Sequence, residues 1–270
     1  AETGQFSSLG GFVSSPLVNI TISLLILCGG LGFSVWGDVF TKKKVKRYGV
    51  QSKIVLSFTF FLILVPSLYF YFAEFSSEAW KETLSGEERV LASLFQSVTP
   101  RTAGFNTVDY AKMSEAGRAV TIVLMMIGGS SGSTAGGMKI TTVAVLLYSA
   151  VSVFRKRKEV RCFGRRIEED TVKQAATISF LYILLFAAGG IAISAIEDLP
   201  VLDCLFESAS AVATVGLTVG ITSTLSLASR LILIFLMYFG RVGGLTLLTA
   251  VLFGRKTEDG RLPVCTIAVG

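Results

Sequence analysis

Two short runs of this sequence carry the residue types from which an ion-binding site could be built. In an extended Thr-x-Gly run the main-chain carbonyl oxygens can turn toward a common axis, and glycine adopts the required backbone angles without a Cβ clash. Rings of such carbonyls replace the water shell of a potassium ion, and the letters TVG begin the potassium-filter sequence TVGYG. We therefore expect a potassium filter, with ordinary glycine-rich outer loops as the alternative, at Thr102, Ala103, Gly104 and Phe105 and at Thr214, Val215, Gly216 and Leu217.

Each run follows an apolar stretch that is too short to cross a membrane. The stretches are ERVLASLFQSV at 88–98 and VLDCLFESASAV at 201–212, and they share the pattern Leu-Phe-Gln/Glu-Ser. Apolar segments of this length are typical of re-entrant or buried helices. Non-helical backbone at membrane depth is tolerated where it is buried or lines a water-filled path. The sequence therefore predicts a unit of span, short helix, Thr-x-Gly and span that occurs twice.

The composition is that of an integral membrane protein. Of the 270 residues, 51% are hydrophobic and only 16% are charged, and the mean hydropathy is +0.66. The net charge of +6 comes from short basic clusters beside apolar segments, which indicates membrane topology and not a nucleic-acid partner. The four cysteines are far apart and lack metal-ligand or redox spacing. We expect an all-α polytopic membrane protein, built from repeats of span, pore helix and span around a central ion pore.

A helix needs about 20 apolar residues to cross the hydrocarbon of a bilayer. Four such segments lie at about 17–40, 54–72, 175–196 and 225–253, and a glycine-interrupted segment at about 120–153 makes a fifth. The connecting loops alternate between basic and acid-rich, which is what five crossings require. The positive-inside rule then predicts cytoplasmic loops at 41–49, 154–166 and 254–262 and outer loops at 73–90 and 197–207.

The fifth segment contains a run of ten small residues, GGSSGSTAGG, at 128–137. Glycine costs roughly 1 kcal/mol in a helix interior relative to alanine, so a continuous helix is disfavoured there. The spacing of Gly128, Gly132 and Gly136 also fits close helix packing through small residues, which is the alternative. A phosphate-binding loop requires G-x-x-x-x-G-K-S/T, but Met138 stands at the lysine position and no βαβ unit surrounds it.

Two cations accompany the apolar segments. Arg241 lies inside the fourth clear span, and a charge at membrane depth costs about 2.5–3.5 kcal/mol on insertion scales and marks function by default. Snorkelling to an interface is the alternative for this arginine. Lys139 directly follows the glycine-rich run, and it fits an interfacial position and a pore-lining position equally well.

Four motifs together resemble the TrkH/TrkG/KtrB/HKT superfamily of potassium transporters, and most of all the KtrB-type membrane subunit of bacterial Ktr potassium uptake systems. The motifs are SVTPRTAGFNTVD at 97–109, GGSSGSTAGGMK at 128–139, ATVGLTVG at 213–220 and MYFGRVGGLTLL at 237–248. The resemblance implies four fused units around one pore, each with a single central filter glycine. It also implies a gate just inside the filter, in which Arg241 and Lys139 join Gly128, Gly129, Ser130, Ser131, Gly132, Ser133, Thr134, Ala135, Gly136 and Gly137.

The chain departs from that pattern because it carries only part of the four units. We expect the second span of unit two and a cytoplasmic loop at 1–50, and a C-terminal tail at 263–270. Unit three would occupy 51–166 with its filter at 99–106 and the gating loop at 128–137, and unit four would occupy 167–262 with its filter at 213–218. Gly32 is not expected to be a filter glycine, because it lies in mid-span without a preceding pore helix. We expect an N-terminally incomplete chain with an intact C-terminus.

The resulting hypothesis is potassium uptake across a bacterial plasma membrane, and the alternative is a non-conducting half-pore subunit with a regulatory or assembly role. No nucleophile and base pair is recognisable, so we expect no enzyme activity and no cofactor bound by this chain. The resemblance implies a homodimer in lipid, a cytoplasmic ring of nucleotide-binding regulatory subunits and sodium coupling in some members. The basic loops at 42–47 and 155–166 are candidate docking surfaces for that ring.

Overall fold

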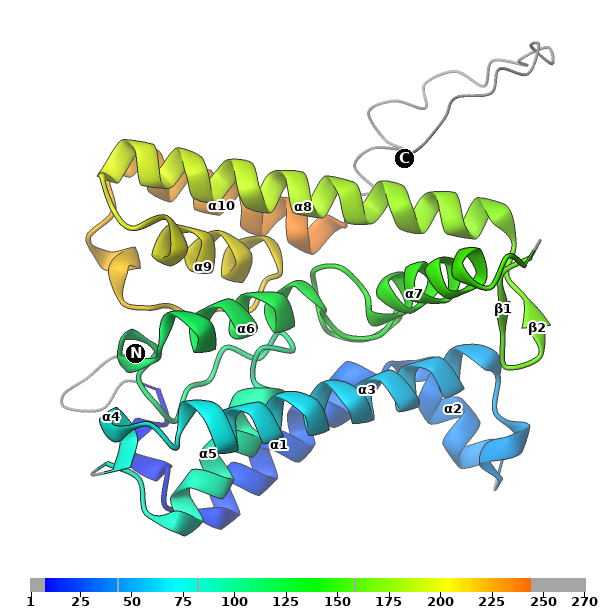
Figure 1. Cartoon of the computed structure of the whole chain (residues 1–270), viewed down its shortest axis with the longest axis horizontal. Helices are drawn as coiled ribbons and strands as arrows, with labels where there is room; N and C mark the ends of the chain where they lie inside the picture. The colour runs from blue at the N-terminus through cyan, green and yellow to red at the C-terminus, as the bar shows by residue number, and fades with distance from the viewer. Residues whose placement is uncertain (1–7, 43, 82, 158, 244–270) are drawn as a thin grey trace.

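The computed structural model describes residues 8–42, 44–81, 83–157 and 159–243. The predicted tail at 263–270, the loop at 254–262 and the last part of the span at 225–253 lie outside these ranges. Within them the chain is predominantly helical, which confirms the all-α class (Figure 1). The helices are α1 Pro16–Leu31, α2 Phe33–Thr41, α3 Val50–Tyr69, α4 Glu78–Lys81, α5 Gly86–Val98, α6 Glu115–Met126, α7 Ile140–Phe154, α8 Glu169–Glu197, α9 Val201–Val212 and α10 Leu227–Val242, and the strands are β1 Arg161–Cys162 and β2 Arg165–Arg166.

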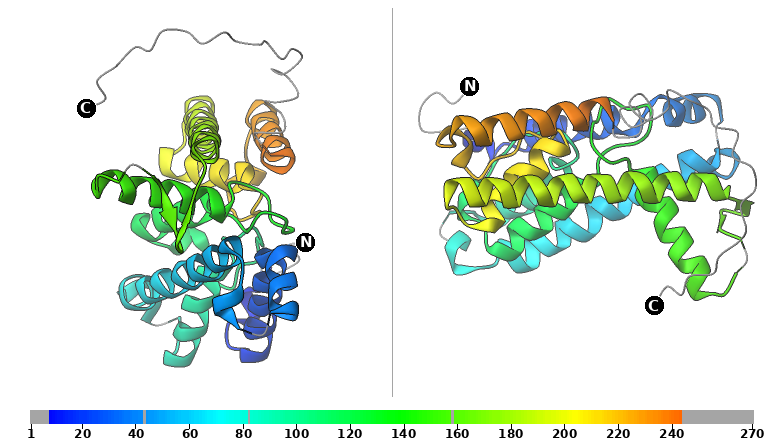
Figure 2. Two further views of the ribbon diagram at one scale, coloured as in Figure 1. Left: turned by 90° about the vertical axis from the view of Figure 1, so that its right-hand side faces the viewer. Right: turned by 90° about the horizontal axis from the view of Figure 1, so that it is seen from above.

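The described helices form two similar units that pack against each other (Figures 1 and 2). In one unit the short helix α5 packs against α3 and α1, and in the other the short helix α9 packs between α8 and α10. Helix α6, which follows the first Thr-x-Gly run and belongs to the same unit as α5, contacts α9 of the other unit. A large cluster of buried apolar side chains runs through this contact and includes Met125, Tyr182, Phe206 and Leu217. The predicted repeat of span and short helix is therefore present.

The two short helices begin and end close to where the sequence places them. The predicted stretch at 201–212 is α9, and the stretch at 88–98 is α5 with two additional residues at its start. Helix α5 begins at a capping box in which the side chain of Ser85 accepts a hydrogen bond from the Glu88 amide and the Glu88 carboxylate accepts one from the Ser85 amide. This reciprocal capping satisfies two main-chain donors that the helix leaves unpaired, and it fixes where the helix begins.

Two of the predicted spans are single apolar helices long enough to cross a bilayer. They are Val50–Glu74, which joins α3 to a π-helical turn at Phe70–Glu74, and the whole of α8. The break predicted within 120–153 is confirmed, because α6 ends at Met126 and α7 begins at Ile140. Helix α7 is too short to pass the same criterion alone. Five crossings therefore remain a prediction for the chain.

The prediction of one continuous span over 17–40 is wrong. Helix α1 ends at Leu31, α2 begins at Phe33, and the two helices meet at an angle of 95°. Gly32 between them has φ +84° and ψ 153°, a combination that is essentially restricted to glycine. Pattern analysis misses this break because the hydropathy remains high across it.

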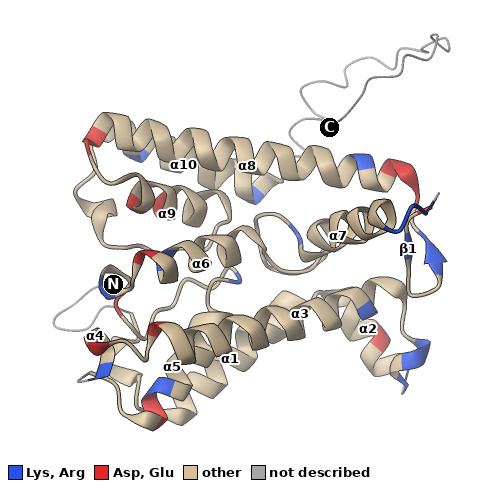
Figure 3. Ribbon diagram, viewed as in Figure 1, with Lys and Arg blue, Asp and Glu red and all other residues tan. Residues whose placement is uncertain are grey.

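The basic segments gather at one end of the molecule. The turn between α2 and α3 and the hairpin of β1 and β2 lie at the same end, and the short helices α5 and α9 lie toward the other (Figures 1 and 3). The hairpin pairs Arg161 with Arg166 and Cys162 with Arg165. This arrangement agrees with the loop sides predicted from the positive-inside rule for 41–49 and 154–166.

Candidate functional site

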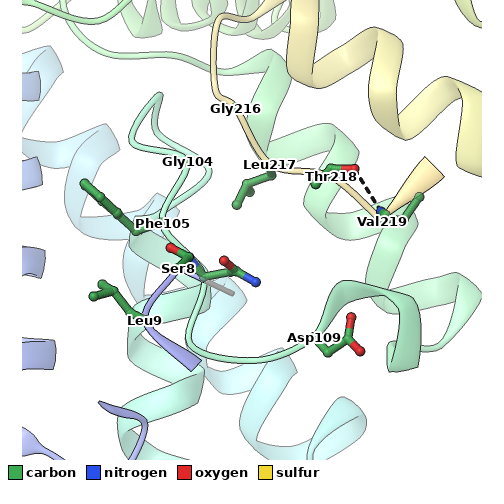
Figure 4. A pocket seen from close by; sticks show the side chains of 11 residues that line it. Ser8, Leu9, Gly104, Phe105, Asp109, Gly216, Leu217, Thr218 and Val219 are labelled. Carbon is green, nitrogen blue, oxygen red and sulfur yellow. Dashed lines mark hydrogen bonds between the residues drawn. The ribbon is translucent and has the colours of Figure 1, made fainter. Parts of the chain in front are cut away.

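The two Thr-x-Gly runs lie against one another, although each belongs to a different unit. A Cβ built on Gly104 would lie only 2.3 Å from the carbonyl oxygen of Val215, and one built on Gly216 would lie 3.8 Å from the Cα of Gly104. A side chain at Gly104 would therefore displace the facing backbone. The structure brings together the two segments that the sequence predicts as filter segments, and Figure 4 shows both glycines beside the same cavity.

The backbone of both runs alternates between positive and negative φ. Thr102 and Gly104 have φ of 65° and 76°, and Thr214 and Gly216 have φ of 56° and 92°, whereas the residue between each pair has negative φ. In a regular extended chain successive carbonyls point to opposite sides. A reversal of φ at every second residue turns them toward one side. Threonine rarely adopts positive φ, and such residues cost about 1–3 kcal/mol each, which is typical of functional sites.

Hydroxyl groups at the end of each short helix hold these strained loops. Thr99 Oγ1 donates a hydrogen bond to the carbonyl oxygen of Phe105. In the other unit, Ser210 Oγ accepts a hydrogen bond from the Gly216 amide at 3.1 Å, and the Ser210 carbonyl accepts one from the Val215 amide at 2.8 Å. The last turn of each helix therefore fixes the conformation of the run that follows it.

In each unit, a side chain of the short helix also accepts hydrogen bonds from the segment that follows the Thr-x-Gly run. The Glu207 carboxylate accepts hydrogen bonds from Thr218 Oγ1 at 2.6 Å, the Val219 amide at 3.1 Å and Thr222 Oγ1 at 2.7 Å. Gln96, which matches Glu207 in the repeat, accepts one from the Tyr110 hydroxyl. Tyr110 and Thr222 each stand six positions after the filter glycine of their own unit. The repeat therefore extends from the short helix to the segment beyond the Thr-x-Gly run.

A cavity of about 450 Å³ opens on one side of the two runs. Its lining includes Gly104, Phe105 and Asp109 from one unit and Gly216 and Leu217 from the other (Figure 4). The cavity lies on the side of the runs to which 105–109 and 217–220 lead. According to the predicted topology this is the outer side.

The glycine-rich segment 128–137 lies against the opposite, threonine ends of the runs. A Cβ on Gly136 would lie 2.0 Å from Thr214 Oγ1, and one on Gly128 would lie 3.7 Å from Thr102 Cγ2. A Cβ on Gly137 would lie 3.0 Å from the Cα of Ala213. Only residues without bulky side chains fit at these positions. The segment is therefore a loop directly beneath both runs, and the alternative of small-residue contacts within a continuous helix is wrong because no helix spans it.

The loop is closed on itself by main-chain hydrogen bonds. The Gly128 amide donates to the Met138 carbonyl at 2.8 Å, and the Ile140 amide donates to the Gly129 carbonyl at 3.0 Å. Ser133 Oγ donates to the Ser130 carbonyl at 2.6 Å. Several polar groups of the loop thus pair with one another, and others bond to α1, α2 and α10. Non-helical backbone inside a membrane protein requires such partners.

Comparison with known proteins identifies the family to which the chain belongs. The family model described as TrkH, cation transport protein, matches residues 3–258. The chain belongs to the TrkH family. It is 37% identical over 255 residues to the Ktr system potassium uptake protein B of Bacillus subtilis and 39% identical over 276 residues to the potassium/sodium uptake protein NtpJ of Enterococcus hirae, and these matches cover 94% and 98% of the chain.

The chain spans less than two thirds of these relatives, because the matches cover 57% and 61% of their lengths. Among solved structures, the crystal structure of the potassium transporter TrkH from Vibrio parahaemolyticus superposes with a TM-score of 0.75 at 21% identity, over 94% of this chain and 56% of that one. At this identity the match shows the fold, and it agrees with the two packed units described above.

Both predicted cations of this TrkH-family chain contact the loop. Arg241, in the last turn of α10, donates from Nη1 to the Thr134 carbonyl at 3.0 Å. Lys139 Nζ donates to the carbonyl of Ala135, the residue that follows Thr134. Neither side chain makes a described ion pair with a carboxylate. The structure thus brings Arg241 and Lys139 together at one short stretch of the loop.

Sequence reasoning missed three residues of the site of this TrkH-family chain. Arg101, which precedes the first run, is only 5% exposed and donates to Thr59 on α3 at 3.1 Å. Glu207 is only 4% exposed and organises the segment after the second run. The repeat could have identified it, because Glu207 matches Gln96. The sequence argues only that Gly32 is not a filter glycine, and it does not show that a Cβ there would lie 2.9 Å from the Ser131 carbonyl in the loop.

Proposed function

We propose that this chain forms part of the conduction pathway of a potassium uptake protein, with Thr102–Phe105 and Thr214–Leu217 as two segments of the ion filter. The observation that carries the proposal is the pair of facing Thr-x-Gly runs with alternating φ. A backbone of this kind presents carbonyl oxygens that can replace the hydration shell of a potassium ion. The names of the two bacterial relatives, both uptake proteins, support potassium as the ion.

We further propose that the loop 128–137 is the gate. It lies against the inner ends of both filter segments, so an ion that leaves the filter meets the loop next. Arg241 and Lys139 hold the loop through the carbonyls of Thr134 and Ala135, and their charges raise the local barrier to cations. Movement of the loop would open the path, and the membrane potential would drive potassium inward with about 2.3 kcal/mol per charge per 100 mV.

The same hypothesis includes the membrane, the oligomeric state and the partner subunits of the chain. The chain would act in a bacterial plasma membrane as part of a homodimer. A cytoplasmic ring of nucleotide-binding subunits would dock on the basic loops at 42–47 and 155–166, whose hairpin exposes Arg161 and Arg166. Sodium coupling belongs to the same proposal, and any nucleotide would be held by the ring and not by this chain.

The test is rubidium uptake in a bacterial strain that lacks its own potassium uptake systems, with the chain expressed from the longest reading frame that contains it. Gly104→Ser and Gly216→Ser should weaken the apparent affinity for rubidium at least several-fold or admit sodium. A side chain at Gly104 would push against the Val215 carbonyl, and one at Gly216 would strain the backbone at φ +92° and so turn the carbonyls beside it. Gly164→Ser is the matched control: its φ is also positive, at 79°, but no atom lies within 4 Å of an added Cβ.

Unchanged rubidium affinity and unchanged sodium exclusion in both filter variants would refute the filter assignment. Absence of uptake by the unmodified protein, at normal membrane levels, would favour the non-conducting half-pore subunit instead. The Gly164→Ser control separates a filter effect from the general cost of a side chain at positive φ.

A further inference from the structure

The break between α1 and α2 faces the loop 128–137. Helix α1 has 16 residues, which is about 24 Å of helix, whereas the hydrocarbon of a bilayer is about 30 Å thick. The two helices are long and apolar enough to cross a membrane only as a pair, yet they are bent by 95° at Gly32. The bent form therefore does not use the full length that the sequence provides for a span.

Breaking a helix leaves main-chain groups without their usual partners, and here the loop supplies the partners. The Gly30 carbonyl accepts a hydrogen bond from the Ser130 amide at 2.9 Å. The Gly29 carbonyl accepts bonds from the amide and Oγ1 of Thr134 at 3.4 and 3.3 Å. The groups that α1 exposes at its end are thus the groups that hold the loop.

The start of α2 is also hydrogen-bonded to the loop. The Phe33 amide donates to the Gly132 carbonyl of the loop at 3.1 Å. In a continuous helix the Phe33 amide would instead donate to the Gly29 carbonyl, and the Ser34 amide would donate to the Gly30 carbonyl. The Phe33 amide has one proton, so it can serve either a straight helix or the loop but not both. Straightening at Gly32 would also return the Gly29 and Gly30 carbonyls to hydrogen bonds within the helix.

Side chains hold the bent form in place. Trp36 Nε1 donates to the Cys28 carbonyl at 3.0 Å, which ties α2 back to α1. The Asp38 carboxylate accepts hydrogen bonds from the Gly49 amide and Ser52 Oγ, both at 2.7 Å, which ties α2 to the start of α3. Beyond α2 the chain enters the basic loop at 41–49.

We propose that the Gly32 break is a latch for the gating loop. In the bent form the exposed groups of α1 and α2 hold 128–137 beneath the filter, and straightening of the two helices returns those groups to the helix and releases the loop. The inference deepens the proposed function, on which it rests, by assigning the regulation of the gate. An anionic cytoplasmic ligand that binds the basic loop more tightly in one form would shift this equilibrium.

The test combines hydrogen exchange with uptake. Gly32→Ala disfavours the bent form, because alanine does not tolerate φ +84° and its Cβ would lie 2.9 Å from the Ser131 carbonyl, whereas alanine favours a continuous helix. The amides of Ser130 and Thr134 should then exchange at least several-fold faster in the purified protein, and rubidium uptake should rise several-fold. Gly37→Ala is the control, since Gly37 lies within α2, makes no described hydrogen bond to the loop and has no atom within 4 Å of an added Cβ.

Trp36→Phe provides a second variant, because it removes the tie to Cys28 without straining the backbone, and it should act in the same direction with a smaller effect. Exchange and uptake in both variants equal to those of Gly37→Ala would overturn the latch. Faster exchange of the loop without any rise in uptake would contradict the proposed gate and not the latch. If Gly32→Ala does not reach the membrane, Trp36→Phe decides between these outcomes by the same two measurements.

Discussion

Replacement of Gly240 by alanine tests the packing that sets the position of the second filter segment. Gly240 lies on α10, and its added Cβ would lie 2.0 Å from the carbonyl oxygen and 2.8 Å from the carbonyl carbon of Val212. That carbonyl cannot move freely, because the amides of Ala213, Thr214 and Val215 are hydrogen-bonded to the last turn of α9. Helix α10 must therefore move away by more than an ångström.

The size of the effect follows from two opposing terms. Overpacking of a well-packed interior costs about 1–3 kcal/mol, and the upper end applies here because backbone is the obstacle. Alanine returns up to about 1 kcal/mol of helix propensity relative to glycine. The net expectation is a destabilisation of about 1–2 kcal/mol. Because the displaced helix also carries the Gly240 carbonyl that accepts a hydrogen bond from the Gly137 amide, the loop and the filter should both be disturbed.

The assay is thermal unfolding of the detergent-solubilised protein, together with rubidium uptake at equal membrane levels. Gly37→Ala is the control, because Gly37 lies in α2 and no atom lies within 4 Å of its added Cβ. Gly240→Ala should melt at a lower temperature and lose potassium selectivity, whereas Gly37→Ala should melt at the same or a higher temperature. Equal melting temperatures and equal uptake in the two variants would refute the argument that α10 positions the filter.

Four further predictions concern contacts of the site. Arg118 and Asp203 form an ion pair between α6 and α9 with side chains 18% and 19% exposed; each single alanine variant should lose about 1–3 kcal/mol of stability, and a double-mutant cycle that shows additive losses would contradict the pairing. Glu207→Gln should retain folding but weaken the apparent affinity for rubidium, since an NH2 group replaces one of the two carboxylate oxygens that accept hydrogen bonds. Unchanged affinity would show that the hydrogen bonds of Glu207 to the segment after the second run do not affect the filter. Arg241→Gln should raise maximal uptake at a normal membrane level, because the positive charge and the long reach to the Thr134 carbonyl are lost; failure to reach the membrane would indicate a structural role instead. Deletion of 130–135 should raise flux well above that of the unmodified protein, and loss of the protein from the membrane would argue against a gate.

Local pattern determines much of this fold. The short helices α5 and α9 could be predicted because their apolar length and their shared Leu-Phe-Gln/Glu-Ser pattern are properties of neighbouring residues. The interruption between α6 and α7 was equally visible, since ten small residues disfavour a helix wherever they stand. The role of the loop as a gate remains a prediction.

The break at Gly32 shows where local pattern fails. Hydropathy is continuous from 17 to 40, and nothing near Gly32 indicates that the carbonyls of Gly29 and Gly30 have partners outside the helix. Those partners are the amides of Ser130 and Thr134, about 100 positions further along the chain. A helix ends where other groups satisfy its main chain, and here the other groups come from tertiary contact.

By itself the sequence determined the membrane class, the two short helices, the duplicated Thr-x-Gly runs and the interrupted segment, because each depends on composition or on spacing within a few turns. Only the tertiary structure decided that Gly104 faces Val215, that Gly136 lies against Thr214, and that Arg241 reaches the loop. A glycine in a sequence shows that a close approach is permitted, but the atom that approaches belongs to another part of the chain. Its identity follows from the packing of the two units, which no local pattern encodes.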